Sequence, residues 1–174
     1  LTAGGNAVLS PHIGDLDHAG AQRLWRRTLD DLSGLHGLAP VAAVADLHPD
    51  YAATRGAAEL GVPVEAVQHH HAHIAACMAE NGLEGPVLGI AWDGTGLGTD
   101  GTVWGGEFLV CTRAEFRRAA WLRPFLLVGG DAAAREPRRA ALGVLREMAS
   151  AHQPPGFAAP ELAVLDGMLA RGVN

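Results

Sequence analysis

The sequence contains no lysine, and its 13 basic residues are all arginines. The absence of lysine excludes two common chemistries, Schiff-base catalysis and phosphate binding by a P-loop lysine. The formal net charge is −6, which argues against a broad nucleic-acid surface because such a surface needs a basic patch. We therefore expect no nucleic-acid partner and no lysine-based active site.

Cysteines and long hydrophobic runs are also scarce. Cys77 and Cys111 are the only cysteines, and they form no CxxC pair. No disulfide framework is expected, so a reducing cytoplasm is the predicted location. No uncharged apolar run approaches the roughly 20 residues that a membrane span needs, and no leader of signal-peptide type opens the chain. We expect no association with a membrane.

The length of 174 residues suits one domain of ordinary size. The first half of the chain alternates between short apolar runs and segments of helical periodicity. The predicted strands are residues 41–45 and 62–67, and the predicted helices are residues 17–36, 51–60 and 70–81. Asp17 is the expected N-cap of the first helix and Gly37 its C-cap. This alternation favours an α/β fold with parallel strands.

The pattern changes at residue 87. The predicted elements there are a hairpin of residues 87–92 and 102–110 around a glycine-rich turn at 94–101, a strand at 117–122, and helices at 136–149 and 160–171. We therefore predict a first lobe over residues 1–86 and the start of a second lobe over residues 87–174.

Four of the nine histidines lie between His69 and His73. His69 and His73 are four residues apart, which on a helix places both rings on one face, about 40° apart. Two imidazoles on neighbouring turns can share one divalent ion, with a third ligand from elsewhere. His70 and His73, three residues apart, form a second candidate pair. The alternative is a polar helix start whose histidines only make local hydrogen bonds.

Asp93 follows an apolar strand and precedes Gly94, Thr95 and Gly96. A strand-terminal aspartate can bind a metal directly or through water, and glycines let backbone N–H groups approach phosphate oxygens. Residues 96–101 also match G-x-G-x-x-G, but a dinucleotide fingerprint requires a helix next, and the pattern of a strand follows here. A phosphate site and a hairpin loop without a ligand both remain open.

Charged residues suggest further ligand contacts. Asp100 and Glu107 are either paired carboxylates across the predicted hairpin or a solvated pair. Arg135 and Arg139 flank a predicted helix start, where an anion would meet both backbone N–H groups and guanidinium groups. The alternative there is a solvated helix end balanced by acidic neighbours. No serine or cysteine has a histidine partner that the sequence identifies, so catalytic residues stay unassigned.

Five stretches, in family order over nearly the whole chain, resemble the carbamoyl-transfer domain of HypF, the hydrogenase maturation carbamoyltransferase family. They are His12–Leu16, Asp46–Tyr51, Val67–Ile74, Asp93–Glu107 and Arg135–Ala140. The resemblance implies an actin/sugar-kinase/Hsp70-like fold, in which α/β lobes with a mixed sheet and flanking helices enclose nucleotide and metal in a cleft.

The resemblance also implies an activity. HypF-like proteins use carbamoyl phosphate and ATP to make carbamoyl adenylate, then carbamoylate the C-terminal cysteine of HypE, whose modified group becomes the cyanide ligand of nickel–iron hydrogenases. The histidine motif is also similar to the H-x-x-x-H metal pair of the TsaD family of tRNA threonylcarbamoyl transferases. Carried over by position, this implies His69 and His73 as ligands for zinc or iron, with Asp93 as a further metal or phosphate contact.

The chain departs from the family pattern at both ends. The acylphosphatase, zinc-finger and YrdC-like modules that would use carbamoyl phosphate and ATP are absent, and so is most of the second lobe. We therefore expect a fragment, truncated at both ends and inactive in isolation, with a further metal ligand beyond residue 174. Two alternatives stay open: a small-molecule O-carbamoyltransferase domain, and an inactive module that keeps only metal or nucleotide affinity.

Overall fold

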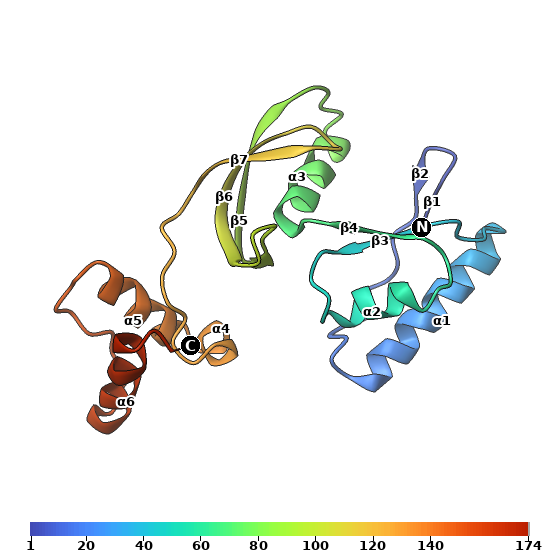
Figure 1. Cartoon of the computed structure of the whole chain (residues 1–174). Helices are drawn as coiled ribbons and strands as arrows, with labels where there is room; N and C mark the ends of the chain where they lie inside the picture. Colours follow the sequence, from blue (N-terminus) through green and yellow to red (C-terminus); the bar gives the residue numbers. More distant parts are fainter. Residues whose placement is uncertain (174) are drawn as a thin grey trace. The chain divides into compact units, whose positions relative to one another are not determined.

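The computed structural model describes residues 1–173, and the chain divides into two compact units (Figure 1). The first unit is Leu1–Leu122, and the second begins at Arg123. The elements follow in the order β1 (Thr2–Ala3), β2 (Asn6–Ala7), α1 (Ala19–His36), β3 (Ala43–Asp46), α2 (Ala52–Ala58), β4 (Val64–Val67), α3 (His69–Glu80), β5 (Val87–Leu97), β6 (Val103–Cys111), β7 (Phe116–Trp121), α4 (Asp131–Arg135), α5 (Pro137–Glu147) and α6 (Ala159–Ala170). The lobe boundary after residue 86 stays a prediction, and residue 174 lies outside the described part.

Helix α1 confirms one predicted cap and corrects the other. It begins after His18, because the N–H of Asp17 donates to the side chain of Asp15 at 2.9 Å and thereby places Asp17 in the preceding turn. The prediction that Asp17 is the N-cap was therefore wrong. The helix ends at Gly37, whose φ of 62° is a conformation that glycine adopts at little cost.

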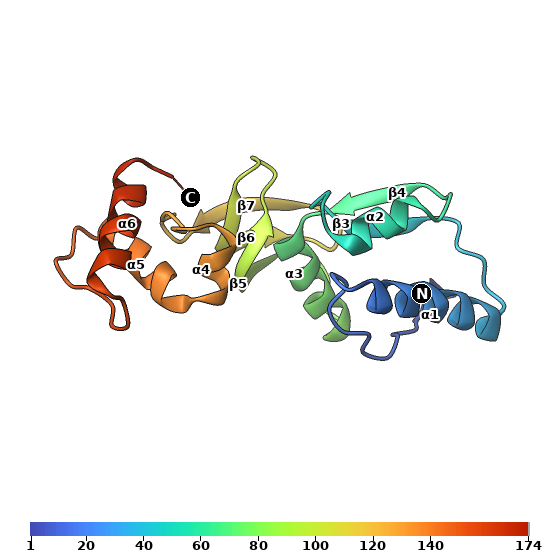
Figure 2. The same cartoon turned by 90° about the horizontal axis from the view of Figure 1, so that it is seen from below.

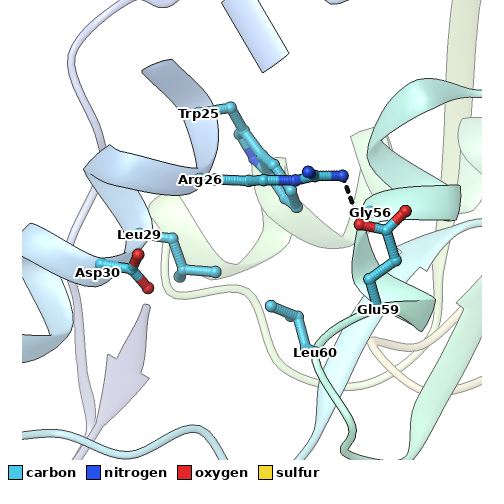
Figure 3. Close-up of a pocket in the computed structure, with 7 residues that line it drawn as sticks. All are labelled: Trp25, Arg26, Leu29, Asp30, Gly56, Glu59 and Leu60. Carbon is cyan, nitrogen blue, oxygen red and sulfur yellow. Dashed lines mark hydrogen bonds and ion pairs between the residues drawn. The ribbon is translucent and has the colours of Figure 1, made fainter. Parts of the chain in front are cut away.

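Helices α1 and α2 pack closely at one point (Figure 3). A Cβ on Gly56 would lie 2.5 Å from the indole of Trp25, so the contact between the two helices requires glycine at this position. Arg26 forms an ion pair with Glu59 across the same gap, beside a small pocket. This packing holds the second half of α2 against α1.

Strands β3 and β4 form a parallel pair, which confirms the predicted parallel pairing. Their register runs from Ala43 opposite Val64 to Asp46 opposite Val67. Asp46 therefore ends its strand beside the residue that leads into α3. The carboxyl ends of parallel strands lie at the same edge of a sheet, and side chains that follow them can meet there.

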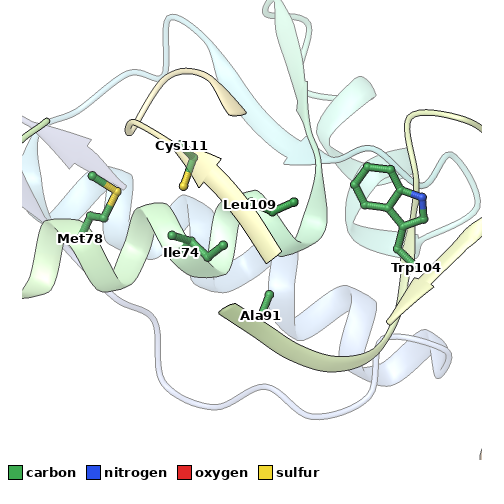
Figure 4. Close-up of a cluster of buried hydrophobic side chains, with 6 residues drawn as sticks. All are labelled: Ile74, Met78, Ala91, Trp104, Leu109 and Cys111. Carbon is green, nitrogen blue, oxygen red and sulfur yellow. The ribbon is translucent and has the colours of Figure 1, made fainter. Parts of the chain in front are cut away.

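Strands β5, β6 and β7 form an antiparallel sheet with α3 against one face (Figure 1 and Figure 2). The core between them contains Ile74, Met78, Ala91, Trp104, Leu109 and Cys111 (Figure 4). Gly89 permits this packing, because a Cβ there would lie 2.4 Å from the side chain of Ile74. Strand β5 continues to Leu97, five residues beyond the predicted end, so the turn that was predicted at 94–101 is confined to the residues after Leu97.

The second unit is helical, and its core contains Val128, Leu142 and Leu165. The helices predicted at 136–149 and 160–171 correspond to α5 and α6, whereas the short helix α4 was not predicted. Among residues 1–173, no helix combines the length and apolar character needed to cross a membrane. The fold is a mixed α/β arrangement of small sheets and helices, and the more specific actin-like lobe architecture stays a prediction.

Candidate metal centre

The candidate site lies at the first turn of α3, directly after β4. Gln68 is the N-cap, and its side-chain oxygen accepts a hydrogen bond from the N–H of His71 at 2.9 Å. An N-cap of this kind satisfies a backbone donor that has no partner within the helix. The helix therefore starts at His69, and the spacing of four residues places His69 and His73 on the same face.

Two histidines and one aspartate converge in the first unit. His69, His73 and Asp93 each offer a ligand atom, and these atoms all lie within 4.8 Å of one another. The Nε2 atoms of His69 and His73 are 3.2 Å apart, and they lie 2.8 and 3.3 Å from Oδ2 of Asp93. Two imidazoles and one carboxylate with solvent on one side are a donor set that suits a divalent transition metal. The structure thus brings together the three predicted ligands, and metal binding itself stays a prediction.

An irregularity in β5 directs Asp93 toward the histidines. Trp92 pairs with Gly106 on β6, but the next pair is Gly96 with Trp104, so residues 93–95 oppose Gly105 alone. Such a bulge bends the strand and redirects a side chain, and bulges are frequent beside functional sites. Asp93 was predicted to end its strand, and its orientation instead comes from a bulge within a longer one.

The predicted phosphate-binding residues lie in and beside this bulge. Gly94 and Thr95 are exposed, whereas Gly96 is buried. A Cβ on Gly96 would lie 2.7 Å from Cε1 of His70 and 2.9 Å from Cβ of His69. Glycine is therefore needed at position 96 for close packing of β5 against α3. Phosphate binding by Gly94, Thr95 and Gly96 stays a prediction.

Asp46 also belongs to the site, although no role was predicted for it from the sequence. Its Oδ2 lies 2.6 Å from Nδ1 of His69. The signal was the same as for Asp93, a carboxylate that follows a short apolar run and opens a polar loop. What sequence could not supply was the parallel register that places the end of β3 beside the start of α3.

His70, which the sequence suggests as a second contact to ligand or metal, lies inside the first unit. Its side chain is fully buried, and Nδ1 lies 3.0 Å from the side-chain nitrogen of Gln68. Because the oxygen of Gln68 caps the helix, this nitrogen is the donor, and Nδ1 of His70 accepts. His70 therefore packs beneath the site against Gly96, and ligand contact by His70 stays a prediction. His71 is also buried, and its Nε2 donates to the carbonyl of Thr112 at 2.9 Å.

The carboxylates around His69 shift the pKa values of the site. Burial lowers the pKa of His69, but hydrogen bonds to Asp46 and Asp93 outweigh it and raise the pKa above its ordinary value. Burial raises the pKa of Asp93, and the hydrogen bonds from His69 and from the N–H of Gly94 reverse this and lower it. Burial lowers the pKa of His70. Burial and then the charges of Asp46 and Asp93 raise the pKa of Tyr51.

We expect the metal-free chain to show His69 and His70 titrating on opposite sides of about pH 6.5, the ordinary value for imidazole. The raised pKa of His69 stabilises the fold fully below that pH, and this contribution is lost as the pH rises through the folded value. The lowered pKa of His70 has the reverse sign and costs stability as the pH falls below about 6.5. NMR titration of the ring signals measures both, and Asp93→Asn should lower the pKa of His69. A pKa for His69 below that of His70 would contradict the assignment.

Asp100 and Glu107 both have partners within the hairpin, and the solvated-pair alternative is wrong for Glu107, whereas Asp100 is exposed. Glu107 is buried, and both of its oxygens accept from Arg118, at 2.6 and 2.8 Å. Asp100 accepts from the indole N–H of Trp104 at 2.9 Å and lies 3.4 Å from Arg118. Arg118 also stacks over the Trp104 ring at 4.0 Å. These contacts hold the hairpin in shape, and ligand binding by Asp100 stays a prediction.

The predicted arginine contacts belong to the second unit. Arg139 lies 3.2 Å from a carboxylate oxygen of Glu136 and 3.7 Å from one of Glu161. Arg138 pairs with the same two glutamates. Arg135 is exposed. The acidic neighbours therefore balance much of the charge at this helix start, and anion binding by Arg135 and Arg139 stays a prediction.

Comparison with known proteins identifies one family along the chain. The family model "HypF Kae1-like domain" matches residues 1–80, and "Carbamoyltransferase, Kae1-like Domain, second subdomain" matches residues 89–174. The chain is 49% identical over 140 residues to "Carbamoyltransferase HypF" of Synechocystis sp., covering 80% of this chain and 18% of that protein. It is 43% identical over 180 residues to "Carbamoyltransferase HypF2" of Cupriavidus necator, covering 100% of this chain and 22% of that protein.

Solved structures give the same result. A crystal structure of full-length HypF in the phosphate- and nucleotide-bound form aligns with a TM-score of 0.83 and 37% identity, over 94% of this chain and 22% of that one. The HypF structure from T. kodakarensis aligns with a TM-score of 0.73 and 36% identity, over 93% of this chain and 20% of that one. The chain therefore spans about a fifth of the length of these relatives.

Proposed function

The chain belongs to the HypF carbamoyltransferase family, a family of transferases, and from this premise we propose that it supplies metal ligands to a carbamoyl-transfer site. The observation that carries the proposal is the convergence of His69, His73 and Asp93 within 4.8 Å. His69 and His73 come from α3 and lie in the stretch that the first HypF model matches, and Asp93 comes from β5 and lies in the stretch that the second one matches. The convergence supports a working site over a surface cluster of histidines.

The proposed reaction is transfer of the carbamoyl group from carbamoyl adenylate to the C-terminal cysteine of a HypE-like protein, in nickel–iron hydrogenase maturation. The thiolate forms a bond to the carbamoyl carbon, the bond from that carbon to the phosphate oxygen breaks, and AMP leaves. Carbamoyl phosphate and ATP would be consumed by other modules of a longer protein. One HypF structure similar to this chain is described as phosphate- and nucleotide-bound, which supports a nucleotide-derived substrate. We place the reaction in the cytoplasm, where Cys77 and Cys111, both free in the structure, would stay reduced.

Three residues of the chain would bind the metal, and two of them also face the solvent. His69 and His73 offer neutral ring nitrogens, and Asp93 offers an anionic oxygen, which together suit zinc or iron. A bound metal would polarise the carbamoyl carbonyl or neutralise phosphate charge. The side chains of His73 and Asp93 are 59% and 39% exposed, and both line an open pocket with Ala91 and Trp92. The substrate would therefore approach on the side of His73, where the site is open.

Two measurements test the proposal. Elemental analysis of the chain purified without added metal is expected to find about one zinc or iron per chain, since one ligand set is present. Mass spectrometry then follows carbamoylation of a HypE-like C-terminal peptide supplied with carbamoyl adenylate, in a HypF protein that carries this domain.

The controls separate the competing functions. A peptide whose terminal cysteine is replaced by serine should stay unmodified, and a HypF protein with alanine at the position of His69 should lose the transfer. Transfer to small-molecule hydroxyl groups in place of the thiol would favour an O-carbamoyltransferase. A chain without metal and without nucleotide affinity in calorimetry would contradict the proposal.

A further inference from the structure

The imidazole of His69 lies between two carboxylates. Its Nδ1 is 2.6 Å from Oδ2 of Asp46, and its Nε2 is 2.8 Å from Oδ2 of Asp93. Among the histidines of residues 1–173, only His69 contacts a carboxylate at each ring nitrogen. The two nitrogens point to opposite sides of the ring. A carboxylate on Nδ1 therefore lies away from an ion on Nε2, and Asp46 is not among the three converging ligand residues.

The position of Asp46 is fixed by contacts of its own. Its Oδ1 accepts a hydrogen bond from the N–H of His48 at 2.8 Å, and its carbonyl accepts from the hydroxyl of Thr54 at 3.2 Å. Its backbone pairs in register with Val67, next to the capping residue of α3. The side chain is 17% exposed, against 69% for Asp31 in the surface ion pair with Arg27. The carboxylate of Asp46 is therefore held in place by the fold, unlike that of a surface ion pair.

We propose that Asp46 is a positioning residue, which orients His69 and holds its proton on Nδ1 so that Nε2 is free to bind the metal. The inference rests on the proposed metal role of His69. A histidine that binds metal through one nitrogen usually donates its other N–H to a carboxylate or carbonyl, which fixes the tautomer and the ring orientation. The geometry here matches that arrangement, with Asp46 as acceptor on one side and the group formed by His73 and Asp93 on the other.

The test compares zinc affinity in Asp46→Ala, Asp46→Asn and Asp50→Ala with the unmodified chain, by competition with a chelator. We expect Asp46→Ala to bind zinc about 10–100-fold more weakly, the range found when such supporting carboxylates are removed. Asp46→Asn should fall in between, because its amide oxygen still accepts a hydrogen bond but carries no charge. Asp50 lies in the loop that follows Asp46 and is exposed, so Asp50→Ala should bind zinc as the unmodified chain does.

A spectroscopic signal separates positioning from general structural support. In the zinc-loaded chain, the Nδ1–H of His69 should give a slowly exchanging proton resonance in 15N-edited NMR. Asp46→Ala should lose that resonance, and Asp46→Asn should restore part of it. If Asp46→Ala does not fold, Asp46→Asn carries both measurements.

The outcomes distinguish the two proposals. Failure of the unmodified chain to bind zinc overturns the proposed metal role of His69, and the role of Asp46 with it. Zinc binding by the unmodified chain with unchanged affinity in both Asp46 variants overturns only the positioning role. Weaker binding in Asp46→Ala with the His69 resonance unchanged also overturns it, because the loss would then not act through the ring.

Discussion

A chain carrying both His69→Ala and His73→Ala is expected to lose stoichiometric metal binding. Structural zinc sites bind with roughly 10–16 kcal/mol of apparent free energy, shared among about four ligands, so removal of two should weaken binding by at least about 10³-fold. The fold should survive, because the side chains of His69 and His73 are 27% and 59% exposed and neither belongs to the apolar core. Elemental analysis and chelator competition measure the loss, and circular dichroism confirms the fold.

The matched control removes two histidines that lie outside the site. His12 and His36 are exposed, so His12→Ala with His36→Ala changes the histidine count equally and should leave metal binding unchanged. The single variants should differ, because His69 is held by carboxylates on both sides whereas His73 is more exposed. We expect His69→Ala to cost more affinity than His73→Ala. A double variant that retains one metal per chain would show that the ion binds elsewhere.

Local patterns in the sequence were sufficient to identify the three residues that converge at the candidate metal centre. The spacing of His69 and His73 depends only on helix geometry, and Asp93 follows a recognisable apolar run. The alternation of strand and helix predicted the parallel pairing of β3 and β4, because two parallel strands need a crossover connection, which is usually a helix. Each of these inferences needs only the residues of one or two neighbouring elements. The helix spacing and the parallel pairing agree with the structure, whereas Asp93 lies within a strand that was predicted to end there.

The features that sequence patterns missed depend on contacts between distant segments. Asp46 meets His69 because two strands share a register, and His70 is buried because β5 covers it. The bulge at Asp93 depends on a shift of two residues between β5 and β6. The sequence showed a glycine-rich stretch there and favoured a turn, because glycine is common in turns and in bulges alike. Only the residues of β6 that pair with this stretch distinguish a bulge from a turn.

The role of Gly96 follows from this packing, and it leads to the second large effect that we expect. Gly96→Ala should lower the free energy of unfolding by about 1–3 kcal/mol, the usual range for an overpacked site. Its Cβ would lie 2.7 Å from the ring of His70 and 2.9 Å from Cβ of His69. His70 is fully buried and cannot move aside freely, so the strand or the helix must shift. Because His69 is on that helix turn, zinc affinity should fall together with stability.

Gly94→Ala is the matched control for the unfolding measurement. Gly94 lies two residues away in the same strand, and a Cβ there would have no neighbour within 4 Å. Its stability should stay within about 0.5 kcal/mol of the unmodified chain, as is usual for open surface positions. Urea unfolding of the metal-free variants compares the two substitutions directly. Equal stability of Gly96→Ala and Gly94→Ala would contradict the close packing of β5 on α3, because the two changes differ only in what the added methyl group meets.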